Sequence, residues 1–132
     1  MKTIKEVGSD GPICSPCPGH KDLIVWQRSM ALVAECYRLS GRFPPSERFG
    51  LVTQIRRAAM SVAANIAEGH GRVHRGAFLN HLSIARGSLK EVETYLEAGR
   101  MLHFASVEDL QTATHLADEI SRMLTVLRRR LL

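Results

Sequence analysis

The sequence of 132 residues contains few aromatic residues and no long apolar run. Phenylalanine, tryptophan and tyrosine make up 5% of the chain, so no base-stacking surface for single-stranded nucleic acid is evident. No stretch approaches the roughly 18–20 consecutive apolar residues that cross a bilayer, and the N-terminus shows no apolar signal segment. We therefore expect a cytoplasmic protein without a membrane partner. The length suits one domain.

Cysteine is also scarce, with Cys14, Cys17 and Cys36 the only three. An odd number without a secretion signal argues against a disulfide framework. Cys14, Cys17 and His20 lie close together, but a closed zinc site needs four ligands and no second pair follows. We therefore expect no metal site and no cofactor, with a zinc-binding or redox role of this segment as the alternative. Cys36 is predicted to be a small core residue.

Catalytic motifs are missing as well. The chain has no glycine-rich phosphate loop of the Walker or dinucleotide type and no serine in a nucleophile elbow. Its six histidines lack the i, i+4 pairing with an intervening glutamate that marks helical metalloprotease sites. Glu68, Glu91 and Glu93 are candidates for an acid–base pair, but nearby arginines favour ion pairs. We predict that the protein is not an enzyme.

The residues that are present divide the chain in two. Residues 1–20 hold three of the five prolines, three glycines and little apolar periodicity, which predicts a flexible tail. From residue 21 to residue 132, apolar residues recur at spacings of three and four, which predicts one helical domain. No segment alternates with period two, so no sheet is expected.

Four helices are predicted in that domain. The first follows an N-cap at Asp22 and ends at Gly41, and the second follows an N-cap at Ser46 and ends near Gly69. The third covers about 76–102, and the fourth follows a variant capping box of Ser106 and Asp109. Short loops make neighbours antiparallel, so the predicted fold is an all-α, up-down-up-down four-helix bundle. The predicted core stripes are Leu23, Trp26, Met30, Val33 and Tyr37; Leu51, Ile55, Ala58, Val62 and Ile66; Phe78, Leu82, Ala85, Leu89, Val92 and Leu96; and Leu110, Ala113, Ala117, Ile120, Leu124, Leu127 and Leu131.

The second helix is apolar around most of its circumference. Ala59, Met60, Ala63, Ala64 and Ala67 lie outside its core stripe. A bundle helix needs one apolar face only, so the extra apolar surface predicts burial against another copy of the chain. The alternative is that alanine is used as a good helix former.

A polar stripe runs beside the core stripe of the same helix. Its members recur at spacings of three or four, which places them on one face. Partners are expected on the third helix, with Arg57 facing a carboxylate and Glu68 facing Arg86. We favour a structural network that fixes register within or between subunits, the alternative being a ligand or nucleic acid site. The residues predicted for the polar network or the oligomer surface are Gln54, Arg57, Met60, Ser61, Asn65, Glu68, Arg86 and Glu93, of which Met60 belongs to the apolar surface.

Positive charge is the strongest functional signal. The net charge is +5 and the isoelectric point is about 9.6. Two clusters carry it, one between the second and third helices and one at the C-terminus, and such clusters favour a polyanion. Ordinary solvated charge is the alternative, and C-terminal arginines also suit the helix dipole. The candidate nucleic-acid-binding residues are Arg72, His74, Arg75, Arg128, Arg129 and Arg130.

The stretch from Glu47 to Arg72, ERFGLVTQIRRAAMSVAANIAEGHGR, resembles a known family when taken with Trp26 upstream and LSIARGSLKEVETYL (82–96) downstream. This is the four-helix bundle family encoded in intervening sequences of bacterial 23S ribosomal RNA genes. The resemblance covers about residues 21–125. Its most specific parts are the Asn65–Gly69 segment, the run Arg56-Arg57-Ala58, and Ala85-Arg86-Gly87-Ser88 followed by Glu91 and Glu93.

The resemblance implies an antiparallel four-helix bundle that assembles as a homopentamer. A related branch, the accessory protein of diversity-generating retroelements, implies a basic barrel that binds nucleic acid and a reverse transcriptase. Ala64 stands where proline is common in the family. We therefore predict a non-enzymatic homo-oligomer that binds the backbone of RNA or DNA through its basic clusters. The alternative is a scaffold for a protein partner, such as a reverse transcriptase or a ribosome-related factor, without direct nucleic acid binding.

Overall fold

The computed structural model describes residues 19–132, so of the expected tail only Gly19 and His20 are described. Two short 3-10 turns, η1 (His20–Asp22) and η2 (Pro45–Glu47), precede the first two helices. Over the described range there is no strand, and the chain is all-α as predicted. The helices are α1 (Ile24–Ser40), α2 (Leu51–His70), α3 (Arg75–Met101) and α4 (Gln111–Leu131).

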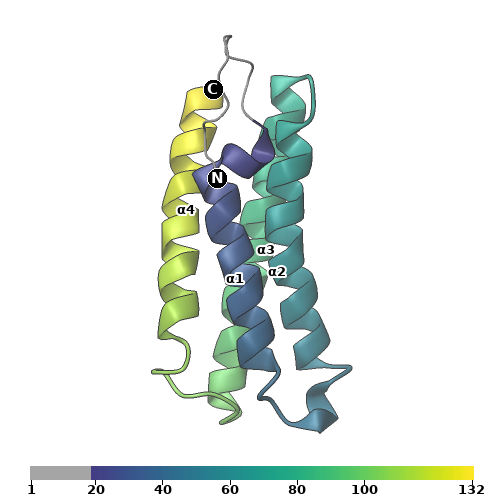
Figure 1. Ribbon diagram of the computed structural model, residues 1–132, viewed down its shortest axis with the longest axis vertical. Coiled ribbons are helices and arrows are strands. Elements are labelled where there is room, and N and C mark those ends of the chain that lie inside the picture. The colour runs from purple at the N-terminus through teal and green to yellow at the C-terminus, as the bar shows by residue number, and fades with distance from the viewer. Residues whose placement is uncertain (1–18) are drawn as a thin grey trace.

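The helices form an up-down-up-down bundle (Figure 1). Contacts join α1 to α2, α2 to α3, α3 to α4 and α4 back to α1, and they are most extensive between α2 and α3. The backbones of the diagonal pairs, α1 with α3 and α2 with α4, do not come within 8 Å of each other at any Cα atom, so the helices stand at the corners of a square. This topology brings the start of α1, the α2–α3 loop and the end of α4 to one end, called here the terminal end. Residues 41–50 and 102–110 form the opposite end.

Apolar side chains from all four helices fill the centre of the bundle. Leu32, Ile55, Leu89 and Ile120 are completely buried. The predicted stripe of α4 is buried as far as Leu124, beyond which the apolar residues are half-buried. None of the helices in the described part of the chain is long and apolar enough to span a membrane.

The buried face of α1 differs from the predicted stripe. Met30 and Tyr37 are 40% and 42% exposed. The helix instead buries a face that includes Ser29 and Ser40, whose hydroxyls donate to the carbonyls of Val25 and Cys36 at 2.7 and 2.6 Å. Because these hydroxyls are satisfied within the helix, serine is tolerated in the core. The buried residues of α1 are Val25, Ser29, Leu32, Val33, Cys36, Leu39 and Ser40.

Two predicted N-caps are wrong. The carboxylate of Asp22 accepts from the Gly19 N–H at 3.1 Å and closes η1, whereas α1 begins one residue after Leu23. Ser46 lies inside η2. The first turn of α2 is held by Glu47, whose Oε1 accepts from the Leu51 N–H at 3.2 Å.

The two hydrogen bonds of the predicted capping box are present, but they close a turn before α4 and do not cap the helix, which begins at Gln111 after Leu110. The Ser106 N–H donates to Asp109 Oδ2, and the Asp109 N–H donates to Ser106 Oγ, both at 3.0 Å. The hydrogen bond from the Ser106 N–H, followed by that of the Ser106 hydroxyl and by the charge of Arg42 at 3.7 Å, lowers the pKa of the Asp109 carboxyl. The pair closes the turn through which the chain leaves the α3–α4 connection and enters α4.

Candidate nucleic-acid interface

Both predicted basic clusters lie at the terminal end of the bundle. Arg72 and His74 are in the loop after α2, Arg75 begins α3, and the second cluster occupies the last turn of α4 (Figure 1). All of these side chains are exposed. Clusters more than fifty residues apart in the sequence thus share one end, because antiparallel helices return the chain to the same end after every second helix.

Carboxylates are few at this end. Asp22 is used to close η1, and Glu68 is paired with Arg72. Within residues 19–132, no carboxylate lies within 4.0 Å of Arg75 or of the arginines at 128–130. At the opposite end, Arg42 and Arg100 each have a carboxylate partner, whereas Arg48 has none within 4.0 Å among the described residues and lies over the Phe49 ring. Uncompensated positive charge is therefore concentrated at the terminal end.

The α2–α3 loop is short and presents its side chains to solvent. It consists of residues 71–74, and His74 adopts an extended conformation just before α3 begins. Between Arg72 and His74, Val73 is 94% exposed. The cluster on α4 has a different setting, because successive helical residues are about 100° apart and the three arginines spread around the last turn. They also face the negative end of the helix dipole, which stabilises them there.

Close packing of α2 against α3 fixes this loop. A Cβ atom added at Gly69 would lie 2.7 Å from His81 Cβ and 3.0 Å from Phe78 Cδ1, so a side chain at this position would push the two helices apart. The His70 ring meets the Phe78 ring edge-on at 5.8 Å between centroids. Glycine at position 69 therefore sets the separation of the helices where they enter and leave the basic loop.

Glu68 has two basic neighbours. Its Oε2 accepts from Arg72 Nη2 at 2.6 Å and lies 3.8 Å from His81 Nε2. The hydrogen bond from Arg72, followed by the nearby His81, lowers the pKa of the Glu68 carboxyl. The predicted pairing of Glu68 with Arg86 is therefore wrong.

The rest of the predicted polar stripe is a network between α2 and α3. Ser61 Oγ and Ser88 Oγ are 2.7 Å apart, and Asn65 Nδ2 donates to the Ser61 carbonyl at 2.9 Å. Arg57 donates to Gln54 at 2.8 Å and lies 4.0 Å from a carboxylate, that of Glu91, as the sequence predicted. The Ser61–Ser88 and Arg57–Glu91 contacts join α2 to α3 and so help to fix the register of the two helices.

Arg86 and Glu93 do not belong to this network. Arg86 reaches α4, where Nη2 donates to Thr125 Oγ1 at 2.7 Å and Nη1 donates to Ser121 Oγ at 3.2 Å. Glu93 pairs with Lys90 at 3.2 Å. At about 100° per residue, positions 86 and 93 fall on the border of the α3 apolar stripe that faces away from α2. The sequence identified the border residues but not which neighbouring helix each border faces.

The alanines of α2 are only partly available to a second copy. Ala59 and Ala63 are 0% and 4% exposed within the single chain, because α2 packs against both α1 and α3. A single chain therefore covers these two alanines, contrary to the prediction. Met60, 48% exposed, and the exposed Ala64 form the apolar surface that α2 still presents to solvent.

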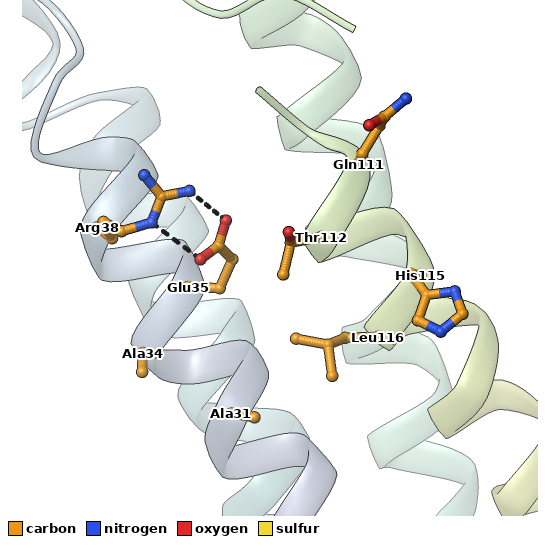
Figure 2. Close-up of a pocket in the computed structure, with 8 residues that line it drawn as sticks. All are labelled: Ala31, Ala34, Glu35, Arg38, Gln111, Thr112, His115 and Leu116. Atoms are coloured by element: carbon orange, nitrogen blue, oxygen red, sulfur yellow. Dashed lines mark hydrogen bonds and ion pairs between the residues drawn. The ribbon is translucent and has the colours of Figure 1, made fainter. Parts of the chain in front are cut away.

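A groove that the sequence reasoning missed lies between α1 and α4 (Figure 2). Its volume is about 660 Å³. Ala31 and Ala34 line one wall and Leu116 the other, while Glu35 is held by Arg38 on the α1 side. Alanines three residues apart on the exposed side of α1 are the only sequence signal for it. The remaining lining residues are Gln111, Thr112 and His115.

The cysteines offer no reactive group in the described chain. Cys36 is completely buried, and burial followed by the charge of Glu35 raises the pKa of its thiol to about 12. A thiol in this state is protonated and a poor nucleophile. Cys14 and Cys17 lie outside the described residues, and His20 stacks edge-on against Trp26 at 5.1 Å between ring centroids.

Comparisons with known proteins agree with this architecture. The model of the family described as 23S rRNA-intervening sequence protein matches residues 21–126. A crystal structure of a protein with unknown function from the S23 ribosomal protein family of Bacteroides thetaiotaomicron VPI-5482 superposes with a TM-score of 0.73 at 25% sequence identity. The match covers 79% of this chain and 97% of that one. No curated protein matches.

Proposed function

The chain belongs to the 23S rRNA-intervening sequence protein family, and from this premise we propose that it is a non-enzymatic, homo-oligomeric bundle that binds the backbone of RNA or DNA. One observation carries the proposal. Arg75 and the arginines at 128–130 lie at the same end of the bundle, and none of them has a carboxylate within 4.0 Å among residues 19–132.

Phosphate is the ligand that suits this end. A guanidinium presents a planar set of donors that matches phosphate oxygens, and each phosphate neutralised releases counterions from the nucleic acid. Trp26 and Phe78 are half-buried against the core, which limits the ring surface that either offers to a base. Binding through the backbone alone predicts weak sequence specificity.

Self-association strengthens the same surface. If copies assemble around an axis, each contributes one terminal end, and the summed field attracts a polyanion more strongly than one copy does. The exposed Met60 and Ala64 on α2 support such an assembly, and covering them removes apolar surface from water. The family resemblance predicts five copies, a number that native mass spectrometry measures directly.

The polar groups of the bundle support a role without chemistry. The network of α2 and α3 engages its side chains with one another, and the Glu35 carboxylate in the groove is bound by Arg38. A general base or nucleophile needs a free, activated group within reach of a substrate. The thiol of Cys36 is buried and protonated.

The test is binding of a fluorescent RNA hairpin and a duplex DNA to the size-defined protein at about 50 and about 200 mM salt, a range over which several phosphate contacts cost orders of magnitude in affinity. The variant Arg72→Glu/Arg75→Glu should bind far more weakly. The matched control is Arg42→Glu/Arg48→Glu, which changes the net charge equally at the opposite end and should bind like the wild type. Affinity that ignores salt, or equal loss in both variants, would overturn the proposal.

A second candidate function is a protein-interaction scaffold, which the α1–α4 groove favours. Its walls carry the apolar side chains of Ala31, Ala34 and Leu116, and a groove of this kind suits a helix or an extended segment of a partner. Replacing Ala34 with glutamate would place a charge in the groove without touching the basic end. Loss of a co-purifying protein in this variant, with nucleic acid binding absent in the wild type, would put the scaffold first.

A further inference from the structure

One carboxylate at the terminal end lies between a loop arginine and a partly buried histidine. Glu68 Oε2 is 2.6 Å from Arg72 Nη2 and 3.8 Å from His81 Nε2. The side chains of Glu68 and Arg72 are 52% and 53% exposed, whereas that of His81 is 14% exposed. The arginine is thus within reach of a phosphate, but in this arrangement its charge is compensated by Glu68.

The tautomer of His81 follows from its other contact. Asn65 Nδ2 donates to the Ser61 carbonyl at 2.9 Å, which directs Asn65 Oδ1 toward His81 Nδ1 at 3.0 Å. A carbonyl oxygen only accepts, so Nδ1 carries the proton of the neutral ring. Nε2 is then the nitrogen that takes up the second proton, and it is the nitrogen that faces Glu68.

We propose that Glu68 and His81 form a proton-controlled switch on Arg72 that sets the affinity of the basic loop for phosphate. The inference rests on the proposed function, because phosphate is the ligand for which Arg72 is released. With a neutral imidazole, Glu68 compensates Arg72. With an imidazolium, a second cation competes for the same carboxylate, and Arg72 becomes free to bind the nucleic acid backbone.

The surroundings of His81 contain few competing charges. Glu68 and Asn65 face the His81 ring from α2, and Gly69 of the same helix packs closely against the His81 Cβ. Arg72 binds the Glu68 carboxylate from the loop. Among residues 19–132, Glu68 is the carboxylate within 4.0 Å of the ring. Protonation of His81 therefore acts first on Glu68.

The direction of the effect follows from charge. Imidazoles gain a proton within the range of pH 5 to 8, and each positive charge near a polyanion strengthens its binding. The wild type should bind duplex DNA more tightly at about pH 5.5 than at about pH 8. His70 and His74 lie at the same end, so variants of His81 and Glu68, and not the wild-type curve alone, isolate the switch.

The decisive variant is Glu68→Gln, which removes the compensating charge at an exposed position. At about pH 8 and 50 mM salt it should bind a 20-base-pair duplex about three- to tenfold more tightly than the wild type, with a salt slope steeper by about 0.9, the value of one additional phosphate contact. Its affinity should also change less between pH 8 and pH 5.5. His81→Gln should gain less affinity between pH 8 and pH 5.5 than the wild type, and His115→Gln on the groove should show the same pH dependence as the wild type.

A double-mutant cycle separates release of Arg72 from simple loss of negative charge. In an Arg72→Gln background, Glu68→Gln should change the affinity by less than about twofold, because the arginine that it releases is absent. An undiminished gain in that background, or an unchanged affinity and salt slope in Glu68→Gln alone, would overturn the switch while leaving the proposed function intact. A wild type that binds neither this duplex nor the RNA hairpin at either pH would overturn both.

Discussion

Replacing Gly69 with alanine tests whether close packing of α2 on α3 shapes the terminal end. The new Cβ would lie 2.7 Å from His81 Cβ and 3.0 Å from Phe78 Cδ1, distances at which atoms must move. Such overpacking costs about 1–3 kcal/mol in the free energy of unfolding. The better helix propensity of alanine offsets at most about 1 kcal/mol of this cost.

The chain provides a matched control in Gly87. It also lies within a helix, α3, but an added Cβ there has no neighbour within 4 Å. Gly87→Ala should therefore stabilise the protein by about 1 kcal/mol through helix propensity alone. The difference between the two variants isolates the steric cost, because both make the same chemical change.

The assay is thermal unfolding followed by circular dichroism at a fixed protein concentration, since association would otherwise shift the midpoint. For a domain of this size, about 1 kcal/mol corresponds to a shift of roughly 3–6 °C. Gly87→Ala should raise the midpoint by about that amount, and Gly69→Ala should fall below Gly87→Ala by about 1–3 kcal/mol. Equal stabilisation by both substitutions would refute the close-packing account.

Three further changes have distinct expected results. Arg86→Met should lower the free energy of unfolding by about 1–3 kcal/mol in urea titrations, because charged hydrogen bonds to α4 are lost, and Arg86→Lys should not restore it. An unchanged free energy of unfolding in Arg86→Met would contradict this role. Asp109→Asn should lower the unfolding midpoint near neutral pH. Because folding lowers the pKa of Asp109, the stability advantage of the wild type should be complete above the pKa of the unfolded state and should disappear as the pH falls through the folded pKa. A difference in midpoint that persists in strong acid would argue against a stabilising role of this carboxylate. In a variant whose only cysteine is Cys36, the native thiol should react with a disulfide reagent at about pH 8 only as fast as the protein unfolds, and immediate labelling would contradict its burial.

The sequence predicts the bundle well because its helices carry strong periodic signals. Leu110, Ala113, Ala117, Ile120 and Leu124 recur at spacings of three and four, and all five are buried. Helix ends were harder to predict, since a side-chain cap depends on the path of the preceding turn. Ser46 has the composition of an N-cap, yet the chain forms η2 there and Glu47 holds the start of α2 instead.

Contacts between helices required the fold. Glu68 and Arg86 both border an apolar stripe, but the sequence does not determine which side of α3 faces α2, and Glu68 meets His81 and Arg72 instead. Ala59 and Ala63 are covered by neighbours within the chain, which composition alone did not reveal. The placement of the two basic clusters at the same end, in contrast, follows from the up-down order of four helices and was implicit in the predicted topology.

The most direct test of the account is to locate the nucleic acid on the protein. Photo-crosslinking to a bromodeoxyuridine-substituted duplex, followed by mass spectrometry of the peptides, reports the residues in contact. The account predicts crosslinks within about residues 70–76 and 126–132, at the terminal end (Figure 1). Crosslinks centred on residues 41–50 and 102–110, or spread along the α1–α4 groove, would contradict the claim that the terminal end is the nucleic-acid interface.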